Sequence, residues 1–174
     1  LTDRPGIAAK IFETLSEASI NVDLIIQATH DGKSNDIAFT VNEFDLTKTI
    51  EQCKLITNQL GGEYNFTTNM TKLSIQGAGI MGRPSVSADL FDTLSQANIN
   101  VRLIATSEIK VSCVIDINNI PKAIRFVGEK FKLSDTQIFI NPVIVREEQP
   151  EVRGIALDKN QVQVSIRNLP DKPG

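Results

Sequence analysis

The stretch RPGIAAKIFETLSEASINVDLI at residues 4–25 recurs as RPSVSADLFDTLSQANINVRLI at residues 83–104, and this recurrence decides the fold. The two copies are identical at 13 of 22 aligned positions, which indicates an internal duplication. A third copy of the opening signature ends the sequence, because LPDKPG at residues 169–174 matches LTDRPG at residues 1–6. The repeat therefore predicts two structural units and the beginning of a third.

The first copy predicts a helix, two strands and a second helix. Apolar residues follow Pro5 at helical spacing, and a strand follows at residues 21–27. Simple alternation would place Asp23 and Gln27 on one face of this strand, and Val22, Leu24 and Ile26 on the other. After a turn and a returning strand, a second helix runs from Leu46 to about Leu60, where two glycines stop it.

The remaining segments complete the units. Strand character resumes at residues 63–68 and 72–76, and the second copy predicts a hairpin strand at 109–117. A helix at 122–131 and a closing strand at 136–145 follow. Strand, helix, strand, strand, helix, strand is a ferredoxin-like α+β unit, in which two helices cover one face of an antiparallel sheet. We expect a first unit at 1–68 without its opening strand, a second unit at 69–146, and a linker with the opening strand of a further unit at 147–174.

A glycine run precedes the second copy of the repeated helix. Gly77, Gly79 and Gly82 have the spacing G-x-G-x-x-G between a strand and a helix, which is the setting of a dinucleotide-binding loop. Pro84 follows almost at once, and proline suits the first turn of a helix. We expect the helix to start at Pro84, after the glycines, whereas a dinucleotide loop needs its third glycine within the first turn. A nucleotide-binding module is therefore the alternative and not the main hypothesis.

Composition argues against several classes of function. A net charge of -3 and a pI near 5.2 give no basic footprint for nucleic acid or an anionic membrane. Aromatic residues make up only 5% of the chain, too few for strands that stack RNA bases. Cys53 and Cys113 form no C-x-x-C pair, so we expect buried free thiols and no metal site. The sequence shows no membrane-spanning apolar run and no signal peptide, which favours a cytoplasmic location.

The start of each repeated helix offers backbone N–H groups that attract an anion, and a carboxylate suits them. Neighbouring polar side chains suit an ammonium, so we expect an amino acid as the ligand. The candidate side chains are Asp3, Asn21 and Gln27 in the first copy, and Ser87, Asn98, Asn100, Ser107 and Glu108 in the second. Asp3 and Asn98 also fit turn or cap roles, and Gln27 fits a solvated position.

Three segments together resemble one family. DRPGIAAKIF at residues 3–12, TSEIKVS at 106–112 and VRGIALDKNQVQVSI at 152–166 resemble the regulatory ACT region of aspartokinase. The resemblance covers essentially the whole chain. The start of a third unit resembles the cyanobacterial aspartokinases with doubled ACT pairs.

The resemblance implies ACT domains in an enzyme that phosphorylates aspartate, with ATP and Mg held by a kinase domain that these residues lack. It also implies inhibition by lysine, threonine or both. From the duplication, the started third unit and the apolar strand faces, we expect a homodimer formed through the ACT domains. We therefore expect no catalytic residue, cofactor or metal here. Carried over by position, the effector-binding residues are Asp3, Gly6, Ile7, Ala8 and Gln27 in the first unit, and Ser87, Asn98, Asn100, Val101, Ser107 and Glu108 in the second. Ser87 stands where family members often have threonine, so the choice between lysine and threonine stays open.

A small enzyme on the same fold is the alternative from another class. An acylphosphatase-like reaction would need a fixed arginine at a phosphate loop, and Arg4 and Arg83 lie in loops of that kind. Each arginine precedes a proline as a repeated turn feature, however, and no general base accompanies it. A regulatory, amino-acid-binding role is the interpretation that the residues favour.

Overall fold

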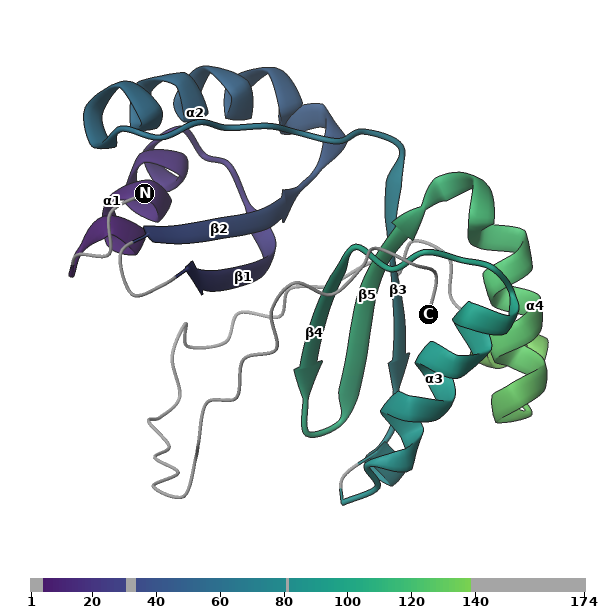
Figure 1. Cartoon of the computed structure of the whole chain (residues 1–174). Helices are drawn as coiled ribbons and strands as arrows, with labels where there is room; N and C mark the ends of the chain where they lie inside the picture. Colours follow the sequence, from purple (N-terminus) through teal and green to yellow (C-terminus); the bar gives the residue numbers. More distant parts are fainter. Residues whose placement is uncertain (1–4, 31–33, 81, 139–174) are drawn as a thin grey trace, which may run out of the picture.

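The computed structural model describes residues 5–30, 34–80 and 82–138. Two successive units, joined by an extended segment, make up this part of the chain (Figure 1). Unit one comprises α1 (Ile7–Glu17), β1 (Val22–His30), β2 (Ser34–Val41) and α2 (Leu46–Leu60). Unit two comprises β3 (Met70–Gln76), α3 (Ser85–Gln96), β4 (Leu103–Ser107), β5 (Lys110–Asp116) and α4 (Ile120–Phe131). Short 3₁₀ helices occupy Glu43–Asp45, Ala78–Ile80, Ile117–Asn119 and Asp135–Gln137.

Unit two is built on an antiparallel sheet of three strands in the order β3–β5–β4. Residues opposite one another share a face, so Leu73 and Ile75 point the same way as Cys113 and Val111. α3 and α4 cover this face, as expected for a ferredoxin-like unit (Figure 1). The buried cluster beneath them consists of Leu90, Leu94, Ala97, Ile99, Val111, Cys113, Ile115, Ala123 and Val127. Most of the predicted closing strand at 136–145 lies outside the described residues.

Unit one has the same helices but a smaller sheet. β1 and β2 pair antiparallel, and α1 and α2 pack on one face around Ile11, Leu15, Ile20 and Ile56. The strand predicted at 63–68 is wrong, because residues 61–68 are exposed and in no strand. Gly61 and Gly62 both have positive φ, 76° and 94°, and lead the chain away from the sheet.

β1 departs from the alternation predicted for it. Its register shifts between Val22 and Ile25, which is a β-bulge. Val22 and Gln27 consequently lie opposite β2 residues of the helix-covered face. The prediction that Val22 and Gln27 lie on opposite faces was therefore wrong, because a bulge adds one residue to the strand. Leu24 donates its backbone N–H to Thr40 Oγ1 at 3.0 Å.

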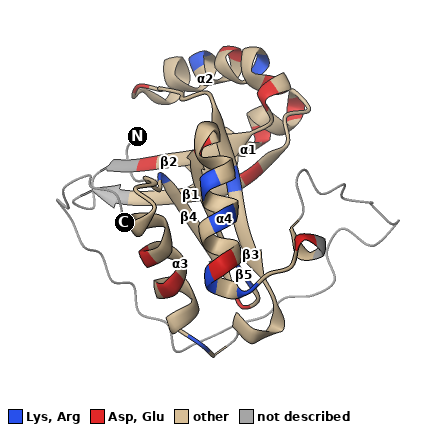
Figure 2. Cartoon of the chain, turned by 90° about the vertical axis from the view of Figure 1, so that its right-hand side faces the viewer, with Lys and Arg blue, Asp and Glu red and all other residues tan. Residues whose placement is uncertain are grey.

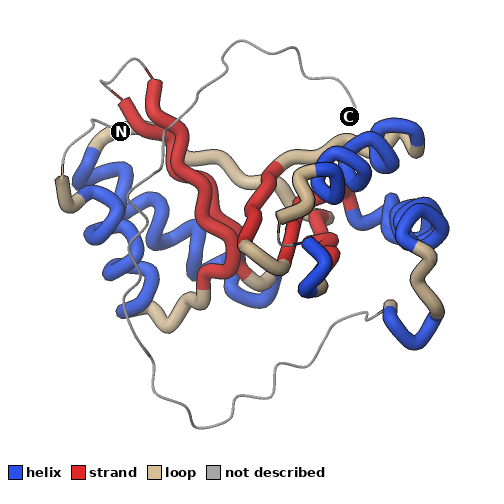
Figure 3. The backbone as a smooth tube through the Cα atoms, turned by 90° about the horizontal axis from the view of Figure 1, so that it is seen from below, coloured by secondary structure: helices blue, strands red, loops and turns tan. Residues whose placement is uncertain are grey.

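The two units meet through their strands. Figure 3 shows the helices on the two outer sides and the strands between them, and β1 contacts β4. A Lys72–Asp23 ion pair also joins β3 to β1 across the boundary. Within unit two, α3 shows acidic segments and α4 mainly basic ones (Figure 2), and Lys130 Nζ lies 2.8 Å from Asp89 Oδ1. Among the described helices, none is long and apolar enough to cross a membrane.

Candidate ligand-binding site

The two repeated helices begin without a side-chain cap. α1 follows Gly6, whose φ is 93°, and α3 follows Pro84, and at neither start does a side chain of the N-cap residue accept a backbone N–H. The second helix of each unit differs, because Asn42 and Asp116 cap the 3₁₀ turns that precede α2 and α4. The first-turn N–H groups of a helix lack acceptors within it. α1 and α3 can therefore offer such donors to an anion, although in α3 the N–H of Val86 already donates to the carbonyl oxygen of Arg83 at 3.1 Å.

An open cavity of about 430 Å³ lies at the start of α3. The loop before α3 forms one wall, and the end of β4 with its hairpin turn forms another. Its lining residues are Ile80, Gly82, Arg83, Pro84, Ser87, Thr106, Ser107, Glu108 and Val111. The cavity thus combines a helix N-terminus with hydroxyl groups and charges of both signs.

Arg83 and Glu108 give the cavity its electrostatic character. Neither side chain has an ion-pair partner among the described residues, and both residues are exposed. The hydroxyl of Ser107 donates to the carbonyl oxygen of Lys110 at 3.4 Å, across the turn that carries Glu108. A cation beside a helix N-terminus suits a carboxylate, and Glu108 suits an ammonium. A zwitterion such as an amino acid matches both.

The structure brings together three of the predicted residues of unit two and separates the others. Ser87, Ser107 and Glu108 line the cavity. Asn98, Asn100 and Val101 follow the other end of α3, about 15 Å from Ser87 at the helical rise of about 1.5 Å per residue. Val101 packs against the core of unit two.

Asn98 has a structural role at the end of α3. Its φ is 51°, in the left-handed region, and the N–H of Ile99 donates to the carbonyl of Leu94 at 2.9 Å. Together these features form a Schellman-type C-cap. Ser19 ends α1 in the same way, with a φ of 55°. The cap alternative for Asn98 therefore agrees with the observed backbone.

In unit one the predicted residues occupy the matching places. Gly6, Ile7 and Ala8 form the start of α1, Gln27 lies exposed on β1, and Asn21 precedes that strand. Asp3 lies outside the described residues. At the repeat offset, Ala8 corresponds to Ser87 and Gln27 to Thr106, which both line the cavity of unit two.

Sequence reasoning missed Thr106 as a lining residue. The signal was present, because extending the aligned repeat by two residues, within the same strands, aligns Thr106 with Gln27. Ile80 and Val111 were also missed. Their apolar character does not distinguish them from core residues.

The thiols and the glycine run do not form a reactive centre. Burial raises the pKa of the Cys113 thiol to about 11 and also raises the pKa of Cys53, so both favour the unreactive thiol form. The described residues contain no group of three His, Cys, Asp or Glu side chains that could hold a metal ion. α3 starts at Ser85, beyond Gly82, and β4 belongs to an antiparallel sheet. This arrangement lacks the parallel strand of a dinucleotide fold.

Comparison with known proteins identifies the family of this fold. The ACT domain profile matches residues 1–54 and 73–131. An aspartokinase from Thermus thermophilus is 36% identical over 135 residues, 76% of this chain and 33% of the relative. The ligand-free regulatory subunit of aspartate kinase from Thermus thermophilus has a TM-score of 0.70 at 34% identity, over 75% of this chain and 87% of that one. The aspartate kinase from Synechocystis has a TM-score of 0.70 at 38% identity, over 77% of this chain and 24% of that one.

Two ferredoxin-like units that repeat one sequence pattern define a class of tandem regulatory domains. The chain belongs to the ACT domain family, as a regulatory region of the aspartokinase type. It spans about a third of the length of the curated aspartokinases that it matches.

Proposed function

We propose that the chain senses amino acids, and that lysine, threonine or both bind it for feedback inhibition of aspartate phosphorylation. The observation that carries the proposal is the cavity of unit two, which residues at the uncapped start of α3 line together with Glu108. The ligand carboxylate binds the first-turn N–H groups and Arg83. The ligand ammonium binds Glu108.

Unit one provides the second half of the proposal. Gly6, Ile7 and Ala8 bind a carboxylate through their N–H groups, while Asp3 and Gln27 receive the ammonium. Asn100 and Val101 approach a ligand from a neighbouring ACT domain, since their own unit places them far from its cavity. The ligand thereby lies at a junction of two ACT domains.

Regulation follows from a preference of the ligand for one arrangement of the domains. A ligand shifts an equilibrium only by its difference in affinity for the two states. We propose that the parent enzyme carries the kinase domain, with ATP and Mg, and that this region transmits the bound state to it. The proposal includes a cytoplasmic location and a homodimer formed through the ACT domains. Half-exposed Ile25 and Ile104, at equivalent positions of edge strands β1 and β4, are apolar side chains that a partner can cover.

Titration calorimetry with lysine and threonine tests the binding. Glu108→Gln and Gln27→Ala should each weaken binding at their own unit at least tenfold, since a charge-assisted contact contributes about 1.5–3 kcal/mol. Glu129→Gln and Gln59→Ala, exposed positions on α4 and α2, are the matched controls and should bind as the wild type does. Absence of binding heat for both amino acids, alone and together, on the intact dimer would refute the proposal.

A further inference from the structure

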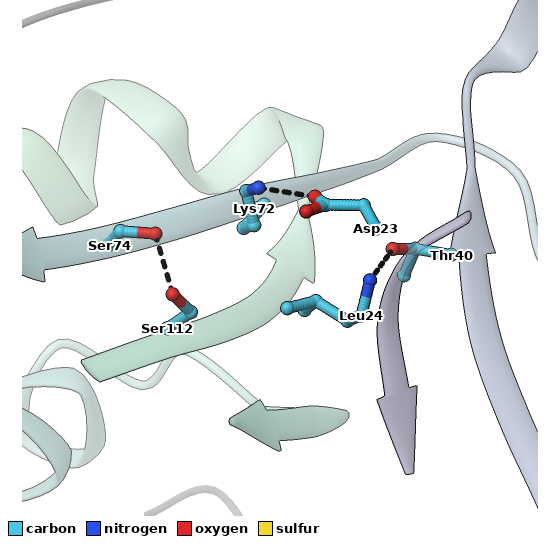
Figure 4. A network of polar contacts seen from close by, with 6 residues as sticks. All are labelled: Asp23, Leu24, Thr40, Lys72, Ser74 and Ser112. Atoms are coloured by element: carbon cyan, nitrogen blue, oxygen red, sulfur yellow. Dashed lines mark hydrogen bonds and ion pairs between the residues drawn. The ribbon is translucent and has the colours of Figure 1, made fainter. Parts of the chain in front are cut away.

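The boundary between the units contains a contact whose partners are far apart in the sequence. Lys72 on β3 pairs with Asp23 on β1, and their side chains are 33% and 49% exposed (Figure 4). The neighbouring polar contacts in Figure 4 lie within single units, because Ser74 bonds Ser112 and Leu24 bonds Thr40. Among the ion pairs of the described residues, this is the one that crosses the boundary.

The bulge in β1 explains how Asp23 reaches unit two. The bulge lies between Val22 and Ile25 and interrupts the regular pairing. The side chains of Asp23 and Leu24 therefore point in other directions than in a regular strand. Figure 4 shows Asp23 directed to Lys72 and Leu24 extending from β1 toward the strands of unit two. Leu24 is only 9% exposed, yet it belongs to neither core cluster.

Within the described residues, no helix covers the face of unit two that receives these side chains. Val114 lies opposite Lys72 on that face and is only 4% exposed, although it too belongs to neither cluster. Its burial therefore comes from outside the helices of unit two, and β1 lies against β4 here. The ion pair thus borders an apolar contact region at the boundary.

Each partner of the ion pair lies on a strand that leads to a candidate site. β1 continues from Asp23 to Gln27, four residues further along. β3 continues from Lys72 to Gln76, and the next turn contains Ile80, which lines the cavity of unit two. Both candidate sites therefore lie at the ends of strands that contribute a partner to the ion pair.

We infer that the Asp23–Lys72 ion pair stabilises the observed arrangement of the two units and couples the two candidate sites. The coupling rests on the proposed function, whereas the role in holding the units does not. Because both side chains are partly exposed, the contribution is that of a surface ion pair, and its loss changes an equilibrium about twofold to fivefold. Coupling is reciprocal, so a ligand bound at one site changes affinity at the other site by the same factor as in the reverse direction.

Residual dipolar couplings of backbone amides in α2 and α4 test the inference on the whole chain. One alignment tensor should fit both units of the wild type. Lys72→Gln and Asp23→Asn should each require two different tensors, and the exchange of charges, Asp23→Lys with Lys72→Asp, should restore one. Lys130→Gln is the matched control, since it breaks an ion pair of similar exposure between α3 and α4 within unit two. A single tensor for both single variants overturns the inference.

A second measurement separates this inference from the proposed function. With lysine or threonine, Lys72→Gln should change affinity about twofold to fivefold at both sites, while Lys130→Gln changes neither. Unchanged affinity in Lys72→Gln overturns the coupling. Failure of the wild type to bind either amino acid refutes the proposed function and the coupling that rests on it, while the dipolar couplings still decide whether the ion pair holds the units.

Discussion

The two units repeat one sequence pattern but close their cores differently. In unit two the helix-facing residues Val111, Cys113 and Ile115 of β5 are 1%, 0% and 0% exposed. Their counterparts on β2 in unit one, Ile37, Phe39 and Val41, are only partly buried. β5 pairs with a strand on either side, whereas in the described residues β2 pairs with β1 alone. In the described residues, the helix-facing positions are thus fully buried on the strand with two neighbours and only partly buried on the strand with one.

The largest difference between the units should appear when the same core leucine is removed from each. Leu15 and Leu94 occupy equivalent positions of the repeat, and both are 0% exposed. Leu94→Ala should lower the free energy of unfolding of unit two by about 3–5 kcal/mol, because its closed core cannot relax into the space that the leucine side chain leaves. Leu15→Ala should lower the free energy of unfolding of unit one by about 2–3 kcal/mol, because the less enclosed core of this unit relaxes more easily into the space left.

Native-state hydrogen exchange measures the two costs separately, since amides of α1 and α3 report on their own units. Equal costs would show that the two cores respond alike. A larger cost for Leu15→Ala would reverse the comparison.

The cysteines offer a second comparison of the cores. Cys113 is fully buried in unit two, and burial raises the pKa of its thiol from the ordinary 9.0 to about 11. Cys53 on α2 of unit one is half-buried, and burial also raises its pKa. At pH 8 a thiol-specific reagent should modify Cys53 at least about tenfold faster than Cys113.

The same shift predicts the alkaline behaviour of unit two. The contribution of the protonated Cys113 thiol to stability is complete below pH 9 and is lost as the pH rises toward about 11. Unfolding of Cys113→Ala should therefore depend less on pH in that range than unfolding of the wild type. Because C113A also lowers stability at every pH, the quantity to compare is the change in the free energy of unfolding per pH unit, and not its absolute value. If the free energy of unfolding of both chains changed equally with pH in this range, the pH dependence would not come from the Cys113 thiol.

The smallest expected effects come from the ends of the repeated helices. Ser19 and Asn98 both adopt positive φ, which glycine tolerates best. Ser19→Gly should stabilise unit one by about 1 kcal/mol. Asn98→Gly should stabilise unit two by a few tenths of a kcal/mol, because asparagine enters this region more easily than serine. Thermal unfolding followed by circular dichroism checks the order of the two variants, and a destabilised Ser19→Gly would contradict the C-cap.

The sequence predicted the elements whose signals are local. The helix expected from Leu46 to about Leu60 forms at Leu46–Leu60, and the helix expected at Pro84 starts at Ser85. Both depend on apolar spacing and on stop or start residues nearby. The repeat itself was sufficient to predict the ferredoxin-like class, since the second copy confirmed the pattern of the first.

Features that depend on partners in space were not predictable in this way. The bulge in β1 arises from its pairing with β2, and alternation along one strand cannot reveal it. Residues 63–68 have strand character, but they form no strand in the structure. In the candidate site, Ser87, Ser107 and Glu108 were predicted, whereas Thr106 was missed because the repeat was not followed beyond its most similar segment.

We propose that this region binds an amino acid where a repeated helix starts beside the end of a strand. A titration of the ¹⁵N-labelled chain with lysine and with threonine, followed by amide chemical shifts, tests this binding most directly. We expect shifts at Ser85–Ser87 and Ser107–Lys110 in unit two, at Gly6–Ala8 and Gln27 in unit one, or at both places. Saturable shifts confined to other surfaces, or no shifts with either amino acid up to millimolar concentration, would contradict it.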